Sequence, residues 1–493
     1  MADEEDSHLV RERRAKAAAW RSLGREPYPW SFPGRESTRA IVESLHGVAP
    51  GSEAVGGPRR VAGRVRSVRA HGKTAFLDLE DLSGSLQLFL RVDELGEATF
   101  KEWLSQLDPG DLVGAVGTPT VTRRGEPSLL VRELVLLAKA LAPPPEKFHG
   151  LKDPEERIRR RYVDLLASAE SRDRFTARSL MVRELRRHLD GLGFLEVETS
   201  ILGTTASGAA AQPFRTRSNY LASDLQLRIS IELALKRLLV GGLERVYEVG
   251  RVFRNEDLDT THSPEFTMME LYWAYADYTD MRGLVEGLYH RIATFLADRF
   301  PSMPSASAAR DAFQPPFATV DWLTAMEKES GISDILSKTP EELRALTEKT
   351  GATVPSDSPP GKFLDKLFEQ YVEPTLTAPT FVLDYPAATT PLAKRHRSRP
   401  GLVERFELFY RGVELGNAYT ELNDPDEQEA RFREQLRGRA DDHYAYDADF
   451  VEALRYGMPP ATGLGIGIDR MAMALLGVSS IKDVVLFLPT RDR

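Results

Sequence analysis

The chain has 493 residues, with 65 Lys and Arg against 74 Asp and Glu, a net charge of −9 and no cysteine. At about 100–200 residues per domain, this length predicts two to four domains. The lack of cysteine excludes disulfides, thiol nucleophiles and Cys-ligated metal centres. No apolar run approaches the about 20 residues that span a bilayer, and the acidic N-terminus does not resemble a signal peptide, so no membrane association and a cytoplasmic location are expected.

Residues 1–57 are predicted to form an N-terminal basic extension. Residues 8–25 combine good helix formers with six basic residues and one acidic residue, which predicts a basic, solvated helix. Such a helix either contacts RNA or only adds solubility. Residues 50–57 are rich in glycine and predict a loop.

Residues 58–145 change to short alternating strands. About five strands with one helical stretch near 94–107 predict a small closed barrel such as an OB-fold. Residues 59–73 contain six Lys and Arg and no acidic residue, and Phe76 and Gln87 fall on adjoining strands. A basic face with an aromatic ring and an amide suits single-stranded nucleic acid, and the alternative is an ordinary solvated surface. A local basic face of this kind can bind RNA although the chain as a whole is acidic.

A proline-stiffened linker and a charged helix over 146–170 predict a hinge between domains. Residues 171–493 alternate helices with strand-rich blocks and form the second domain. Within it, residues from about 301 to 380 are mostly helical and interrupted by proline and serine, which predicts an insertion. Residues 194–202 are apolar and directly follow a helix, so by themselves they predict a buried core strand.

The block 246–278 predicts a strand, a polar loop and a returning strand. Alternation places Phe266, Glu270 and Tyr272 on one face of the returning strand, and Arg254 and Glu256 lie at the entrance of the loop. Together these side chains could hold a phosphate, stack on a base and bind a cation. The alternative is a plain hairpin with an ordinary Arg–Glu pair.

The block 461–477 predicts a glycine-rich strand followed by an apolar helix. Gly463, Gly465 and Gly467 alternate along the strand, and Asp469 and Arg470 open the helix. The spacing fits neither the dinucleotide fingerprint nor the P-loop. The glycines either let a ligand approach the backbone or serve tight strand–helix packing.

The block 404–425 supplies more polar side chains on strands. Glu407 and Glu414 are candidate oxygen ligands for Mg²⁺, and Asn417, Tyr419 and Glu421 share one face of a strand. Three glutamates of the chain lie among apolar residues, where an uncompensated carboxylate is costly, and so suggest a cationic ligand: Glu232, Glu270 and Glu421.

Taken together, these blocks resemble the class II aminoacyl-tRNA synthetases. The segment FRNE followed by THSPEFTMMELYWAYADY resembles motif 2 of that family, GLGIGIDR resembles motif 3, and GFLEVETSIL resembles motif 1. The stretches GGLERVYEVG, PLAKRHR, ELNDP and YGMPP are similar to the lysyl-tRNA synthetases and unlike their aspartate and asparagine relatives. HGKTAFLDLEDLSG is similar to their anticodon-binding domain, so the resemblance covers nearly the whole chain.

The resemblance implies an α+β protein, with an OB-fold barrel followed by a catalytic domain whose antiparallel sheet is flanked by helices. It implies lysine–tRNA ligase activity with L-lysine, ATP and tRNA(Lys) as substrates, Mg²⁺ as cofactor, and a homodimer built on motif 1. The alternatives are a paralogue that passes activated lysine to another acceptor, and a non-catalytic RNA-binding relative.

The resemblance also implies the site residues. The catalytic residues are Arg254, Glu256 and Arg470. The ATP-binding residues are Arg254, His262, Phe266, Glu407, Gly467 and Arg470, with Glu407 and Glu414 as Mg²⁺ ligands. The lysine-binding residues are Gly208, Glu232, Glu270, Tyr272, Asn417, Tyr419 and Glu421. The anticodon-binding residues are Arg69, Phe76, Gln87 and Glu133. The sequence departs from the family pattern at Ser200, Gln212, Ala234 and Ser263.

Overall fold

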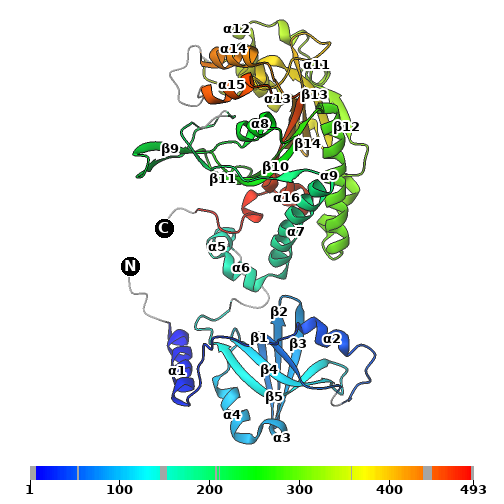
Figure 1. Ribbon diagram of the computed structural model, residues 1–493. Coiled ribbons are helices and arrows are strands. Elements are labelled where there is room, and N and C mark those ends of the chain that lie inside the picture. The colour runs from blue at the N-terminus through cyan, green and yellow to red at the C-terminus, as the bar shows by residue number, and fades with distance from the viewer. Residues whose placement is uncertain are drawn as a thin grey trace. The chain divides into compact units, whose positions relative to one another are not determined.

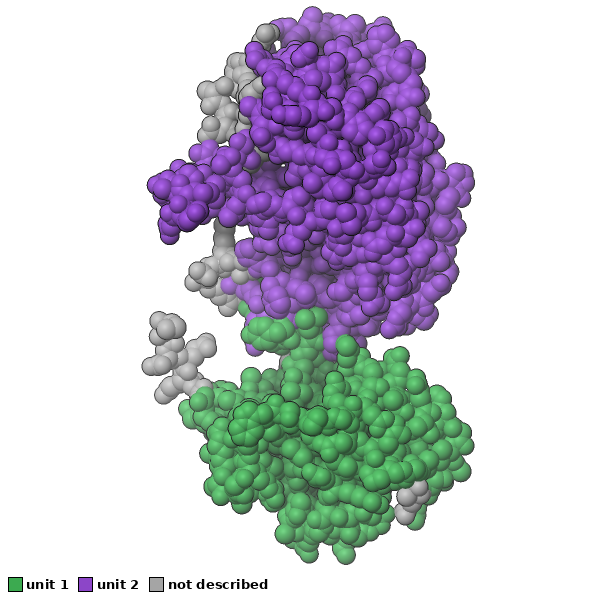
Figure 2. Space-filling model, in the orientation of Figure 1, with its two compact units in different colours: residues 1–157, 162–167 green, residues 158–161, 168–493 purple. Residues whose placement is uncertain are grey.

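The computed structural model of the protein describes residues 7–52, 55–144, 151, 153–205, 208–209, 211–356, 358–436 and 447–489. The predicted hinge over 146–170 lies partly outside these described residues, as do the first six residues of the predicted N-terminal extension. The chain divides into two compact units, one of residues 1–157 and 162–167 and the other of residues 158–161 and 168–493 (Figure 2).

The first unit is built around a closed barrel with the strand order β1-β2-β3-β5-β4, which confirms the predicted OB-fold (Figure 1). Its strands alternate as a barrel wall requires, because Leu77 and Leu79 point into the core whereas Phe76 and Asp78 point outward. The elements of this unit are α1 (His8–Ser22), α2 (Thr38–Ser44), β1 (Arg59–His71), β2 (Thr74–Asp81), β3 (Gly84–Arg91), α3 (Val92–Leu95), α4 (Glu97–Gln106), β4 (Leu112–Val121) and β5 (Pro127–Ala138).

Helix α1 is not a fully solvated helix as the sequence predicted. Arg13 is buried and donates to the backbone oxygens of Ala140, at 2.8 Å, and Pro109, at 3.2 Å. Trp20 packs edge-on against Trp103 of α4, with ring centroids 4.6 Å apart. The helix therefore covers part of the barrel unit with one face, and composition alone could not reveal that face.

The second unit contains an eight-stranded sheet in the order β12-β13-β14-β15-β16-β11-β10-β6, and a small sheet in the order β7-β9-β8 (Figure 1). Neighbouring strands of the large sheet are antiparallel except for the pairs β12–β13 and β6–β10. The strands are β6 (Leu195–Glu196), β7 (Leu202–Gly203), β8 (Arg215–Ser218), β9 (Ser223–Leu227), β10 (Arg245–Phe253), β11 (Glu265–Ala274), β12 (Ala318–Asp321), β13 (Thr380–Pro386), β14 (Leu402–Tyr410), β15 (Val413–Thr420) and β16 (Ala461–Gly467).

Helices flank this sheet, so the α+β class with an antiparallel catalytic sheet is confirmed. Two short helices, α5 (Pro154–Arg159) and α6 (Arg161–Ala167), lie in the stretch of sequence where the chain passes from the first unit to the second. The others are α7 (Ala169–Gly191), α8 (Glu232–Val240), α9 (Tyr278–Arg299), α10 (Pro304–Ala312), α11 (Trp322–Ser330), α12 (Pro340–Lys349), α13 (Pro360–Tyr371), α14 (Pro425–Leu436), α15 (Ala448–Arg455) and α16 (Ile468–Leu476), with 3₁₀ turns η1 (Ile335–Ser337), η2 (Glu373–Thr375), η3 (Ala387–Thr389) and η4 (Ile481–Asp483). No helix in the described ranges combines the length and apolar character needed to cross a membrane.

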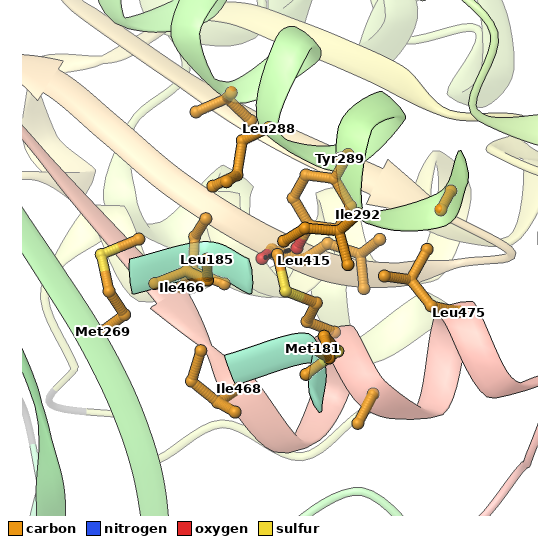
Figure 3. Close-up of a cluster of buried hydrophobic side chains, with 14 of the residues drawn as sticks. Met181, Leu185, Met269, Leu288, Tyr289, Ile292, Leu415, Ile466, Ile468 and Leu475 are labelled. Carbon is orange, nitrogen blue, oxygen red and sulfur yellow. Dashed lines mark hydrogen bonds between the residues drawn. The ribbon is translucent and has the colours of Figure 1, made fainter. Parts of the chain in front are cut away.

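The largest core lies between one face of the sheet and the helices α7, α9 and α16 (Figure 3). Met269 of β11, Leu415 of β15 and Ile466 of β16 point into it, and the Tyr289 hydroxyl of α9 donates to the Leu415 backbone oxygen at 2.8 Å. Because side chains alternate along a strand, the residues between these core positions point to the opposite face of the sheet. That opposite face carries the polar residues that the sequence singled out.

Two segments of the second unit differ from simple expectations. Within the predicted core strand over 194–202, the structure has only the two-residue strand β6 and the first residue of β7, and Leu195 is 53% exposed, with Ile201 and Leu202 also exposed. The prediction of a buried strand is therefore wrong, because β6 lies at the edge of the sheet with only β10 beside it. Residues 301–380 are mostly helical, but they also supply β12, which extends the large sheet.

Candidate active site

A cavity of about 1040 Å³ opens on the polar face of the large sheet. Strands β11, β14, β15 and β16 form its floor, and the loops after β10 and before α8 contribute to its wall. All the predicted catalytic, ATP, metal and lysine residues except Glu421 line it: Gly208, Glu232, Arg254, Glu256, His262, Phe266, Glu270, Tyr272, Glu407, Glu414, Asn417, Tyr419, Gly467 and Arg470. Residues far apart in the sequence are thus brought into one cavity.

One part of the cavity is cationic and aromatic. The Arg254 guanidinium lies 5.2 Å from the ring centroid of Phe266, and its Nε donates to the Ile229 backbone oxygen at 3.3 Å. Burial lowers the pKa of Arg254 from its ordinary value, against the opposing charges of Glu256 and Glu270. An arginine still ionises in this setting, so it presents a fixed positive charge held beside an aromatic surface.

A second arginine, Arg470, lies in the same part of the cavity. It contacts His262 Nε2 at 3.0 Å through Nη2 and Glu414 Oε2 at 3.4 Å through Nη1. The other ring nitrogen of His262 contacts Asp259 Oδ2 at 2.8 Å. An imidazole with its Nδ1 proton toward Asp259 presents an Nε2 acceptor to Arg470, so Asp259, His262 and Arg470 form a chain that positions the guanidinium.

Helix α16 is tied to β11 directly behind this cationic part. Asp469, buried at the start of the helix, accepts from the Thr267 backbone N–H at 2.9 Å and from Arg178 of α7 at 2.5 Å. Because Arg470 directly follows Asp469, these bonds also fix the backbone position from which the Arg470 side chain extends. The predicted strand-to-helix transition at Asp469 is confirmed.

The rest of the cavity is rich in buried carboxylates. Glu270 accepts from the Ile231 backbone N–H at 2.8 Å, from the Ser230 hydroxyl at 3.0 Å and from the Tyr272 hydroxyl at 3.2 Å. Burial, and then the charge of Glu232, raise the pKa of Glu270 to about 7. Glu232 in turn accepts from the Tyr419 hydroxyl at 2.7 Å. Such a group of acids is stable only with cations nearby.

One of these cations belongs to the chain itself. Lys236 is fully buried, lies 2.6 Å from Glu232 Oε1 and forms an ion pair with Glu421. Glu421 is also fully buried, behind the residues that line the cavity. Its Oε1 accepts no hydrogen bond from the described residues and lies beside Gly463, where any Cβ would collide with it. The predicted need for a cation is thus met in part by Lys236, and one oxygen of Glu421 remains next to the cavity floor.

The two predicted Mg²⁺ ligands lie on neighbouring strands of the cavity floor. Glu407 of β14 accepts from the Tyr385 hydroxyl at 2.7 Å and pairs with Arg405, and Glu414 of β15 contacts Arg470. Burial raises the pKa of Glu407, Arg405 opposes that effect, and Glu414 adds to it. Mg²⁺ in nucleotide sites takes one or two carboxylates and completes its octahedron with phosphate oxygens and water, so this pair fits the ion.

The four predicted anticodon residues lie on the barrel. Arg69 pairs with Phe76 in the β1–β2 register, and Gln87 of β3 accepts from the Ser128 hydroxyl at 3.0 Å. The Phe76 ring stacks on Phe89, with centroids 4.8 Å apart and planes 6° from parallel. Glu133 is exposed on β5. The arginines of β1 are less available than predicted, because three of them pair with acidic residues: Arg59 with Glu36, Arg66 with Glu80 and Arg69 with Asp78.

Three contributors were missed by the sequence analysis although signals for them existed. Lys236 lies four residues after Glu232 on α8, the spacing of an ion pair on a helix. Arg405 lies two residues before Glu407 and so shares its face of β14, where it also donates to Asn417 Oδ1 at 3.1 Å. Phe89 lies two residues after Gln87 and shares the outer face of β3.

The sequence comparisons agree with this geometry. Residues 153–491 match the family of tRNA synthetases class II (D, K and N), and residues 60–137 match an OB-fold nucleic acid binding domain. The chain is 44% identical to a lysine–tRNA ligase of Moorella thermoacetica, with all of both chains covered. It is 47% identical to a lysine–tRNA ligase of Roseiflexus castenholzii, covering 99% of each chain. It is also 47% identical to that of Deinococcus radiodurans, covering 94% of this chain and 90% of the relative.

The family match covers the strands that form the cavity, and the relatives are matched along the barrel as well. Full-length similarity at this level shows common family membership and not only a common fold. The chain therefore belongs to the lysine–tRNA ligases among the class II tRNA synthetases.

Proposed function

We propose that this protein activates L-lysine with ATP and transfers the lysyl group to the 3′-terminal ribose of tRNA(Lys). The observation that carries the proposal is one cavity with a cationic, aromatic part around Arg254 and a carboxylate-rich part around Glu270. ATP needs positive charge and a stacking surface, whereas the lysine side chain needs negative charge. The two parts therefore suit the two substrates of the activation step.

In the first step, the lysine carboxylate attacks the α-phosphate, and pyrophosphate leaves. In this proposal Arg254 holds the carboxylate against the α-phosphate, Phe266 stacks on adenine, and Arg470 holds the γ-phosphate. No residue of the chain acts as a nucleophile, so the residues contribute positioning and charge stabilisation. Glu407 and Glu414 would hold Mg²⁺, which offsets negative charge on the phosphates when bound.

The carboxylate-rich part is suited to select the amino acid. In this proposal Glu232 and the backbone at Gly208 receive the α-amino group, and Glu270, Tyr272 and Glu421 receive the ε-ammonium, with Asn417 and Tyr419 beside them. A neutral side chain would leave buried carboxylates unpaired, and sites of this kind reject such analogues strongly. Ornithine, which is shorter by one methylene, is the harder competitor.

The proposed reaction is tested by lysine-dependent exchange between ATP and labelled pyrophosphate. The assay is run with each of the twenty amino acids and is followed by charging of purified tRNAs. We expect exchange with lysine and charging of tRNA(Lys). Exchange with lysine without charging of any tRNA would favour the paralogue with another acceptor, and no exchange at all would favour the non-catalytic relative. Neither alternative explains why the chain keeps both Arg254 with Arg470 and the barrel.

We place tRNA recognition on the outer barrel face formed by Arg69, Phe76 and Gln87, with Phe89 added to it. Phe76→Ala should lower kcat/KM for tRNA charging by about 10- to 100-fold, because stacking of one base is worth ~1–3 kcal/mol. Pyrophosphate exchange should not change, because activation takes place in the second unit. Trp30→Ala removes another exposed ring of the first unit and is the matched control. A similar loss of charging in both variants would count against the stacking face.

We also propose that a second copy of the chain covers the exposed apolar segment around β6. Leu195, Ile201 and Leu202 lie in one short stretch of the chain and are each more than 40% exposed, and exposed apolar surface of this kind marks interaction sites. Ser200, which stands where the family pattern has proline, donates to the Leu202 backbone oxygen at 2.7 Å. Sedimentation equilibrium at micromolar concentration should give the mass of two chains, and the mass of one chain would contradict the proposal. The cytoplasm is the proposed location, because the substrates of tRNA charging are present there.

A further inference from the structure

Lys236 is the most unusual charged residue of the cavity region. It lies on the buried side of α8 with no exposed surface, among Leu233, Leu235 and Leu239. A fully buried lysine requires compensation, because moving its charge out of water is costly. Its ammonium contacts Glu232 one turn earlier on the helix and Glu421 at the end of β15, and it also lies over the Tyr419 ring at 5.6 Å.

The charges around Lys236 are unequal in number. Three carboxylates, Glu232, Glu270 and Glu421, face this part of the cavity or its floor, whereas Lys236 supplies one positive charge. When all four groups are ionised, two negative charges remain. Lysine as a substrate brings two ammonium groups. The carboxylate of the substrate is assigned to Arg254. These two opposite charges neutralise each other and do not enter the count for the three acids and Lys236.

We propose that Lys236 is a positioning residue that keeps the three acids of the amino-acid pocket ionised and leaves two of their negative charges for the two ammonium groups of the substrate. This inference rests on the proposed function and deepens it, because it names the residue that limits the pocket to a diamino acid. Without Lys236 the three acids would lack a partner for one charge, and they would take up a proton or another cation.

The geometry also indicates how Lys236 orients Glu421. The ammonium contacts Oε2, so Oε1 remains on the side of Gly463, which lines the cavity floor. Oε1 has no hydrogen-bond partner among the described residues, although Glu421 is fully buried. A buried oxygen of this kind gains most from a charged donor. Lys236 thus holds Glu421 with its unpaired oxygen toward Gly463 of the cavity floor, from which its charge acts on the substrate ammonium.

The proton equilibria agree with this arrangement. Burial opposes a charge on Lys236, but Glu232 and Glu421 outweigh that effect and hold its pKa above the ordinary value. Burial raises the pKa of Glu421, Lys236 opposes the rise, and Glu232 and Glu270 add to it. Loss of the Lys236 charge would therefore raise the pKa of the acids further and leave an additional proton in the pocket near neutral pH.

The first test is Lys236→Met, which keeps the length of the side chain and removes its charge. At pH 7 the KM for lysine in pyrophosphate exchange should rise on the order of 10- to 100-fold, while the KM for ATP changes less than about 3-fold. The rise is expected because the additional proton neutralises a carboxylate, such as Glu421, that would otherwise bind an ammonium group. It should therefore shrink between pH 7 and pH 8.5, where this proton is lost. A purely structural role would instead lower kcat at every pH and leave KM for lysine nearly constant.

The matched control is Lys139→Met in the barrel. Lys139 is also buried and ion-paired, with Asp111 at 2.8 Å, but it lies outside the cavity. Its loss should lower the melting temperature and leave the KM for lysine in pyrophosphate exchange unchanged. An equal rise in KM for both variants would contradict a specific role of Lys236.

The decisive test adds Lys236→Met to Glu421→Gln. Glu421→Gln alone leaves one negative charge for two substrate ammonium groups, whereas the double variant restores two negative charges through Glu232 and Glu270. We expect the double variant to have a KM for lysine several-fold lower than that of Glu421→Gln alone, although above that of the wild type. It removes both members of the ion pair, so it remains informative if Lys236→Met alone does not fold.

A KM for lysine in the double variant equal to or above that of Glu421→Gln would overturn the inference. That result differs from failure of the proposed function, in which the wild-type protein itself would show no exchange with lysine.

Discussion

Replacing Arg254 with alanine should reduce lysine-dependent pyrophosphate exchange by about 10³-fold or more, because a preorganised charge at the reacting phosphorus is lost. Arg254 is half-buried in the cavity wall, held by the Ile229 backbone and packed against Phe266. The loss should appear mainly in kcat, since the charge acts on the transition state. The melting temperature should change little because a polar cavity can take up water.

The control for this variant is Arg251→Ala on β10, the strand that directly precedes Arg254. Arg251 is 40% exposed, contacts Glu265 at 3.5 Å and lies outside the cavity lining. It should leave the exchange rate within about 2-fold of the wild type, as expected for an exposed ion pair of small energetic value. Normal exchange by Arg254→Ala would reject the proposed phosphate role.

Glu421→Gln is expected to raise the KM for lysine on the order of 100-fold and to leave the KM for ATP nearly unchanged. The substitution keeps the shape of the side chain and removes its charge beside Gly463. The Lys236 ammonium then lacks one of its two carboxylate partners, which further disfavours a second ammonium nearby. Steady-state exchange kinetics at saturating concentrations of the other substrate separate the two KM values.

Glu184→Gln serves as the control for this second variant. Glu184 is also buried and ion-paired, with Arg291 at 2.8 Å, but it lies on α7, and α7 packs against the core face of the sheet. It should lower stability without a change in either KM. If Glu421→Gln raised both KM values equally, its role in binding the lysine side chain would be contradicted.

The strand faces of the cavity could be predicted from the sequence because they depend on local alternation. Period-two spacing placed Phe266, Glu270 and Tyr272 together, and the structure has them on the cavity face of β11. The same rule could not show which strands become neighbours. That β16 lies between β11 and β15 follows from long-range pairing, which no local pattern contains.

Other features depend on partners that are distant in the sequence. The sequence around Arg13 and Trp20 predicted a solvated helix. The two side chains are buried because α1 packs against the barrel unit, whose contacting residues are distant in the sequence. Leu195 gave the pattern of a core residue, but its strand lies at the sheet edge. The basic segment of β1 favoured a charged RNA-binding face. Acidic neighbours on β2 pair with much of that charge, which leaves the Phe76–Phe89 stack as the clearer feature.

The alternating glycines of β16 affect the entropy of ligand binding. Gly463, Gly465 and Gly467 present only backbone to the cavity, and the ladders to β11 and β15 already fix that backbone. A floor of side chains would lose rotamer freedom when a ligand covers it, at about 0.5–1.5 kcal/mol for each immobilised long side chain. The β16 part of the floor has no side-chain rotamers to lose. Its contribution to affinity is therefore already present in the folded protein before either substrate arrives.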